Sequence, residues 1–201
     1  MIYGYKYKNM EKINVIDSSD ASIVRGNGHT ESMGLQGFYT VECVGADGQV
    51  KWVDTVPNTV TTVGKNLALD TILAGSAYTV TGPYMGLISS TGYSAISAAD
   101  TMSSHAGWTE AGNANAPTYT SPRKTCAWSA ASGGSKALSA ALSFAITGTG
   151  TVKGCFIVFG SGALTTIDNT AGTLLSAGLF TGGDKAVVNT DTLNVTYTLA
   201  A

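Results

Sequence analysis

The sequence predicts an all-β protein, a jelly-roll-like β-sandwich that carries one short helix and an extended N-terminal arm. Short segments beyond residue 37 alternate large apolar with polar residues, and glycine-rich turns such as GTG, GSG and TGGD separate them. A single stretch has clear helical spacing. Several short strands at fairly even spacing are typical of a sandwich or barrel, and 201 residues suffice for one domain with a substantial core.

The N-terminal 36 residues differ in composition from the rest. The chain has 11 basic and 13 acidic side chains, and half of these, twelve in all, lie within residues 1–60. Residues 1–36 combine Tyr3, Tyr5 and Tyr7 with a polar run that has a sustained period of neither 2 nor 3.6. We therefore expect residues 1–36 to be an extended arm that lays its tyrosines on a partner, and residues 37–201 to be the sandwich.

The first elements of the sandwich are a hairpin and a helix. FYTVECV (38–44) and QVKWVDTV (49–56) each alternate apolar and polar residues around the turn sequence GADG, which predicts a β-hairpin. In the following TVGKNLALDTILAGS, Val63, Leu67, Ile72 and Leu73 follow helical spacing, and Gly75 stands where a helix terminates.

The remaining chain is expected to form strands and turns. Alternation is clearest in DTLNVTYTLA, where Leu193, Val195, Tyr197 and Leu199 share one face. A helix is the alternative for the alanine-rich KALSAALSFAIT. The expected strands are PYMGLIS (83–89), KTCAWSA (124–130), KALSAALSFAIT (136–147), TVKGCFIVFG (151–160), TLLSAGLF (173–180), KAVVN (185–189) and DTLNVTYTLA (191–200).

Composition argues against several functional classes. The net charge of −2, without a lysine- or arginine-rich run, offers nucleic acid no attraction. Cys43, Cys126 and Cys155 are widely spaced without a metal-binding pattern, so we expect reduced, buried thiols and neither metal nor cofactor. The chain shows neither a signal-peptide core nor an apolar run of membrane-spanning length, so we expect synthesis in a cytoplasm and no membrane partner.

The stretch DTMSSHAGWTE (100–110) gathers residue types of a hydrolase centre or a sugar-binding cleft. A catalytic triad is assembled from separate parts of a fold, so this clustering is no evidence for one, and no G-x-S-x-G turn is present. We expect no catalytic residue. We expect Asp100 and its hydroxyl-bearing neighbours to cap local backbone, with His105 and Trp108 as structural anchors. Glycan binding by Trp108 and neighbouring aromatics is the alternative.

The chain also resembles a family of virion structural proteins of tailed bacteriophages. Over residues 38–201 the resemblance rests on WVDTVPNTVTTVGKNLALDTILAGSAYTV (52–80), YMGLISS (84–90), DTMSSHAGWTE, Pro122-Arg123, GTVKGCFIV (150–158), TLLSAGLFTGGDKAV (173–187) and DTLNVTYTLA. The motif of the first block includes Trp52 and Asn58, which we expect to be structural anchors. Where the family pattern has a glycine before the aspartate of the last strand, this chain has Thr190-Asp191.

The resemblance implies a non-enzymatic component of a phage virion. Its expected position is the head, as a capsid decoration or cement protein that binds the major capsid protein or other virion subunits. The expected assembly is a homo-oligomer, a trimer in preference. A tail or fibre component that binds host glycans is the alternative, and a hydrolase using His105 is a third reading.

Overall fold

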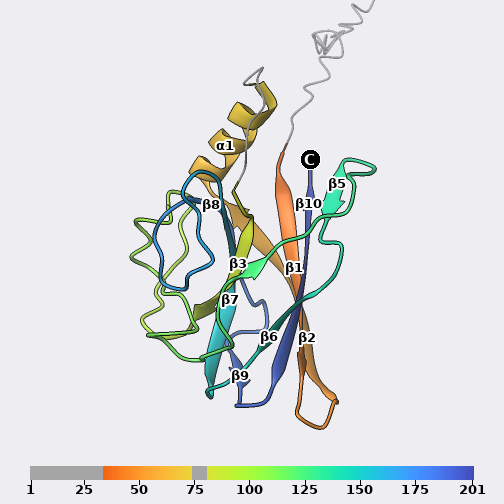
Figure 1. The fold of residues 1–201 in the computed structure, drawn as a ribbon, viewed down its shortest axis with the longest axis vertical. Helices are drawn as coiled ribbons and strands as arrows, with labels where there is room; N and C mark the ends of the chain where they lie inside the picture. The colour runs from red at the N-terminus through yellow and green to blue at the C-terminus, as the bar shows by residue number, and fades with distance from the viewer. Residues whose placement is uncertain (1–33, 74–80) are drawn as a thin grey trace, which may run out of the picture. The chain divides into compact units, whose positions relative to one another are not determined.

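The computed structural model describes residues 34–73 and 81–201, and this part of the chain is built from antiparallel strands with one helix (Figure 1). The prediction of an all-β protein is thus confirmed. Its elements are β1 (Gln36–Val44), β2 (Val50–Val60), α1 (Thr62–Leu73), β3 (Tyr84–Ser89), β4 (Lys124–Thr125), β5 (Ser135–Ala137), β6 (Leu142–Ala145), β7 (Gly150–Phe159), β8 (Thr173–Leu179), β9 (Lys185–Val187) and β10 (Thr192–Ala200).

All strands belong to one continuous sheet in the order β4-β3-β7-β8-β2-β1-β10-β5, with β6 also paired to β10 and β9 to β7. Strand β2 joins the two halves, because its first part pairs with β1 and its last residues, Asn58 to Val60, pair with β8. The predicted hairpin of residues 38–56 is confirmed as β1 and β2. The alanine-rich stretch 136–147 forms the short strands β5 and β6 against β10, and not a helix.

The main core lies between the two halves of the sheet. It takes alternate side chains of β1, namely Tyr39, Val41 and Cys43, and those of β10, as the period of a strand requires. The rings of Tyr39 and Tyr197 lie 4.6 Å apart. Because side chains from both halves join one cluster, the sheet must curl around them.

A second apolar cluster covers the opposite face of β3, β7 and β8. There Phe156 and Val158 of β7 pack with Trp108 and Met102, which come from the long connection between β3 and β4. Strand β7 is therefore buried on both faces, which explains the unbroken apolar run CFIVF. The stretch DTMSSHAGWTE belongs to this covering layer.

Helix α1 is confirmed, but its apolar residues do not form one buried face. Thr61 caps the helix by accepting a hydrogen bond from the amide of Gly64 (3.0 Å), and Leu67 packs against the core. Ile72 and Leu73, expected to continue this face, are exposed instead. The expected terminator, Gly75, lies outside the described residues, as do Tyr3, Tyr5 and Tyr7 of the expected arm.

The turn before β10 holds Thr190 at a φ of 80°. This left-handed region favours glycine. The turn is held by Asp191, whose carboxylate accepts hydrogen bonds from the amide of Val188 (2.9 Å) and the ammonium of Lys51 (2.7 Å). Thr190 therefore occupies a glycine conformation in a turn that buried contacts impose.

Candidate functional site

Trp108 anchors the covering layer. Its side chain is only 2% exposed, its ring lies 5.2 Å from that of Phe156, and its indole N–H donates to Oδ2 of Asp100 (3.0 Å). The same oxygen accepts the amide of Ser97 (2.9 Å). Asp100 thus caps local backbone and satisfies the buried indole, and Trp108 has no exposed ring face on which a sugar could stack.

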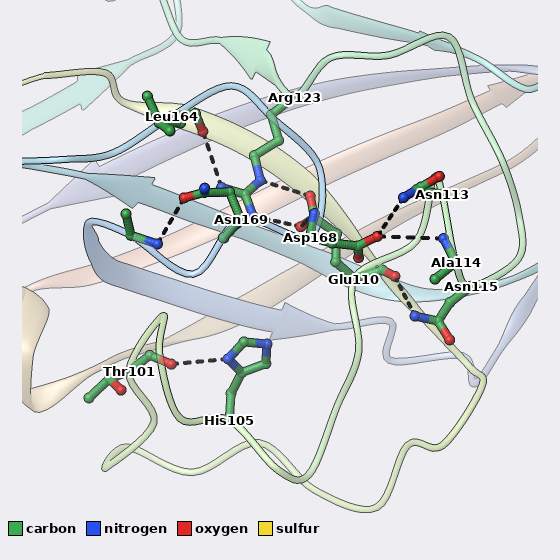
Figure 2. Close-up of polar contacts among 11 residues, drawn as sticks. Thr101, His105, Glu110, Asn113, Ala114, Asn115, Arg123, Leu164, Asp168 and Asn169 are labelled. Carbon is green, nitrogen blue, oxygen red and sulfur yellow. Dashed lines mark hydrogen bonds and ion pairs between the residues drawn. The ribbon is translucent and has the colours of Figure 1, made fainter.

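His105 is held against Trp108 and the backbone. The two rings lie 4.1 Å apart, and Nδ1 of His105 is 3.1 Å from the carbonyl oxygen of Thr101 (Figure 2). A carbonyl oxygen only accepts, so Nδ1 carries the proton and, in the neutral ring, Nε2 is the acceptor. Within the described residues no serine or threonine hydroxyl hydrogen-bonds His105, so the nucleophile–base contact of a hydrolase is not formed there.

The last residue of the stretch, Glu110, forms a buried ion pair with Arg123 (Figure 2). Nε and Nη2 of Arg123 donate to the two carboxylate oxygens of Glu110 at 2.8 and 2.6 Å. Arg123 also donates to the carbonyl oxygens of Leu164 (3.1 Å) and Asn169 (2.7 Å). The pair therefore ties the covering layer to the loop between β7 and β8.

Asp168 completes this network from the same loop. Its amide donates to Oε2 of Glu110 (2.8 Å), and its own carboxylate accepts from Nδ2 of Asn113 (3.0 Å). Burial raises the pKa of Glu110, and the hydrogen bonds from Arg123 offset this only in part, so the pKa stays above its ordinary 4.5. Four of the five N–H donors of Arg123 and both carboxylate oxygens of Glu110 nevertheless take part in hydrogen bonds, which offsets the cost of burying the two charges.

A cavity of about 150 Å³ lies beside the network. A cavity of this size has room for a few water molecules or one small polar molecule. Glu110 already accepts three hydrogen bonds, two from Arg123 and one from the amide of Asp168. The lining residues are Met102, His105, Trp108, Thr109, Glu110, Asn115, Asp168, Asn169 and Thr170.

The other two residues expected as anchors, Trp52 and Asn58, lie on β2. The half-buried ring of Trp52 packs edge-on against Phe180 at 5.4 Å, below the ammonium of Lys185. Nδ2 of Asn58 donates to the hydroxyl of Tyr197 (2.7 Å). These contacts link β2 to the residue that follows β8, to β9 and to β10, and involve none of the residues that hydrogen-bond Glu110.

Metal and thiol chemistry find little support in this part of the chain. Across residues 34–73 and 81–201, no three histidine, cysteine, aspartate or glutamate side chains gather where they could hold one metal ion. Cys43, Cys126 and Cys155 are free and buried, as predicted, and burial raises the pKa of Cys43 to about 11 and that of Cys126 to about 12. Such thiols are unreactive near neutral pH.

A second candidate site is the outer face of β1, β2 and β10, which we call the open face. It consists of nine side chains in three rows across the strands: Phe38, Pro57 and Thr198; Thr40, Thr55 and Thr196; Glu42, Val53 and Asn194. None of the nine is buried, and Phe38 and Val53 are 44% and 57% exposed. Glu42 is the only charged residue among them, so this face is nearly uncharged.

Comparison with family models, with curated proteins and with solved structures finds no match to this chain. Within the described residues, no helix has the length and apolar character that crossing a membrane requires.

Sequence reasoning placed DTMSSHAGWTE and Pro122-Arg123 among the notable segments but did not pair Glu110 with Arg123. A weak signal was present, because Asp100 and Glu110 are the only charged residues between Asp70 and Arg123.

Proposed function

We propose that this chain is a non-enzymatic structural protein of a tailed-phage virion. In this proposal it is a decoration or cement protein that binds the major capsid protein and stabilises the head lattice as a homo-oligomer, a trimer in preference. The observation that best supports this proposal is the open face. A surface mainly of threonine, valine, proline and phenylalanine with one charge can be desolvated against a shell at little electrostatic cost.

The size of the open face favours a protein that binds through many copies. Nine positions spaced by about 4.8 Å across strands and about 6.8 Å along them span roughly 300 Å² of sheet. A stable complex buries about 800 Å² per partner. One open face is therefore too small to hold a copy alone, and an oligomer that engages several faces gains its affinity by avidity.

Two further parts of the proposal concern the fold and the arm. The jelly-roll-like arrangement is supported by β2, which passes from one half of the curled sheet to the other. Tyr3, Tyr5 and Tyr7 of the arm are proposed to contact a shell or sister subunit and to order on assembly. Because β1 begins at Gln36 and Leu35 packs against the core, the test removes residues 1–34, which is expected to abolish capsid binding while the sandwich stays folded.

The geometry of Trp108 and His105 supports the structural reading of DTMSSHAGWTE. A buried indole bound to Asp100, and an imidazole bound to the Thr101 carbonyl, stabilise the loop over β7. A glycan reader needs an exposed ring. The proposal therefore assigns this stretch to stability of the domain and assigns binding to the open face.

The test compares two valine substitutions on capsids that lack the protein. We expect Val53→Glu, which places a second charge on the open face, to weaken capsid binding about 100-fold or more through avidity. Val188→Glu is the matched control, since Val188 is 45% exposed but lies outside the open face. Equal capsid binding by both variants in a pelleting assay would show that the open face does not contact the capsid.

Copy number separates the head from the tail. Quantitative mass spectrometry of purified particles should find about one copy per capsid subunit for a lattice-binding protein. A few copies per particle would contradict the decoration role and support the tail or fibre alternative.

A further inference from the structure

A groove borders the open face on the side of β8. Its volume is about 370 Å³, and its lining combines Pro57 and Thr59 of β2, Leu179 of β8 and residues 93–96 of the connection between β3 and β4. We call this feature the border groove. Because an apolar cavity of about 150 Å³ can hold benzene, the border groove has room for one aromatic or large aliphatic side chain.

The border groove is continuous with the open face. Pro57 belongs to both, and Thr59 follows on the same face of β2, because alternate residues of a strand point the same way. On the neighbouring strands, Phe38 lies opposite Pro57, and Ala177 lies opposite Thr59. The open face and the groove therefore form one surface across β10, β1, β2 and β8. A partner that covers the open face next to Pro57 also meets the groove.

The groove offers little to a polar ligand. None of its nine lining residues, all within the described ranges, is charged. The amides of Ser94 and Ala95 both donate to the carbonyl oxygen of Gly107, at 2.7 and 3.1 Å. Ile96 and Leu179, in contrast, are only half-buried. A sugar needs several convergent hydrogen-bonding groups, whereas an apolar side chain needs none, so the groove fits an apolar side chain better.

The surroundings of Tyr93 also disfavour a sugar. The ammonium of Lys153 lies 4.5 Å from the centre of the Tyr93 ring, over one face of the ring, where a sugar would otherwise stack. Lys153 is itself held by an ion pair with Asp184, and Tyr93 packs against the second apolar cluster. Contacts within one copy thus fix this side of the groove, and a preformed pocket costs a partner less ordering.

We propose that the border groove receives one large apolar side chain that projects from the capsid subunit bound at the open face. This docking rests on the proposed function and adds the chemistry of the partner, which is an uncharged patch with a protruding aromatic or large aliphatic residue. The open face alone spans roughly 300 Å², well short of the about 800 Å² per partner in a stable complex. A side chain that fills a pocket at an interface contributes much of the binding energy.

Filling the groove tests the docking. Ala95 is exposed at the groove, so Ala95→Trp supplies an indole that competes with the incoming side chain. In the pelleting assay on capsids that lack the protein, we expect at least about tenfold weaker binding. Ala99→Trp is the matched control and should bind as wild type does, because Ala99 is exposed in the same connection but does not line the groove. Wild-type binding by Ala95→Trp would overturn the docking.

A thiol probe reports on the groove without filling it. Cys43, Cys126 and Cys155 are buried, so a maleimide should react first with the thiol introduced by Ala95→Cys. We expect capsid binding to slow this reaction at least about tenfold and to leave the thiol introduced by Ala99→Cys as reactive as before. Protection of both thiols alike, or of neither, would contradict insertion into the groove. Protection of Ala95→Cys by soluble oligosaccharides and not by capsids would overturn the docking in favour of a sugar site.

Failure of the docking and failure of the proposed function are distinguishable. A wild-type chain that does not bind capsids contradicts the proposed function. Loss of binding by Val53→Glu together with wild-type binding by Ala95→Trp leaves the open face as the contact and overturns only the docking in the groove. Thermal unfolding of each variant confirms that it is folded, so that weaker binding reports on the altered surface.

Discussion

Glu110 and Arg123 form a two-pronged ion pair in the interior, with side chains that are 3% and 0% exposed. The pair joins the covering layer over β7 to the loop that precedes β8. Arg123 also lies 5.4 Å from the ring of Phe156, so the guanidinium contacts the apolar cluster beneath the layer. The arrangement of DTMSSHAGWTE therefore depends on a residue outside that stretch.

Loss of the arginine should be costly. Arg123→Met leaves the carboxylate of Glu110 buried without its partner, and we expect the free energy of unfolding to fall by about 3–5 kcal/mol. Urea denaturation measures this loss of unfolding free energy. Lys153→Met is the control, because the pair of Lys153 with Asp184 is partly exposed at 25% and 39% and should contribute about 0–1 kcal/mol. Similar losses in the two variants would contradict a special role for the buried pair.

The conformation of Thr190 predicts a stabilising substitution. A β-branched residue at a φ of 80° is strained, and Thr190→Gly should raise the free energy of unfolding by about 0.5–1 kcal/mol after the entropy cost of glycine. Thr192→Gly, within β10, should instead destabilise the protein by a similar amount. Thermal unfolding of both variants shows whether the melting temperature rises or falls in each. A lower melting temperature for Thr190→Gly would mean that the threonine side chain makes a contact worth more than the strain.

Gly64 should not tolerate alanine, although alanine is the better helix former by about 1 kcal/mol. An added Cβ would lie 2.6 Å from the carbonyl oxygen of Leu175 and 2.9 Å from its Cα, so helix and strand would have to separate. We expect Gly64→Ala to destabilise the protein by about 1–3 kcal/mol. Asn66→Ala, at an exposed position of the same helix, should be neutral or stabilising. Chemical denaturation of the two variants shows whether the close contact with Leu175 or the helix propensity of alanine dominates at residue 64.

Asp191 should make the stability depend on acid pH. Burial raises the pKa of this carboxyl group, but hydrogen bonds from Lys51 and the Val188 amide lower the pKa by more. The net result is a pKa below the ordinary 3.8. The folded state thus binds this proton less readily than the unfolded state. The resulting stability is present above the unfolded pKa and is lost as pH falls through the folded pKa.

Asp191→Asn tests this dependence. The variant should be less stable at neutral pH, and its stability should fall less steeply than that of the wild type as the pH drops below the ordinary pKa of 3.8. Denaturation over this range provides the comparison. Parallel curves for wild type and variant would assign the acid sensitivity to other carboxyl groups, such as Asp54, whose pKa is also lowered.

Local patterns were sufficient for most elements. Alternation in residues 38–56 and 191–200 predicted the hairpin and β10, because successive side chains of a strand point to opposite faces. The stretch 136–147 was ambiguous in sequence, since short apolar runs fit helix and strand alike. Its pairing with β10, 47 to 63 residues away in sequence, decides in favour of strands.

The sequence by itself determined the all-β class, the one helix and the buried cysteines. Only the tertiary structure decided the partners of the charged and aromatic residues. Arg123 meets Glu110 and the 164–169 loop because the curled sheet brings three distant segments over β7. The direction of Leu73, outward from the domain, depends likewise on where α1 leaves the sheet. Periodicity reports which residues share a face, whereas chain topology decides what that face meets.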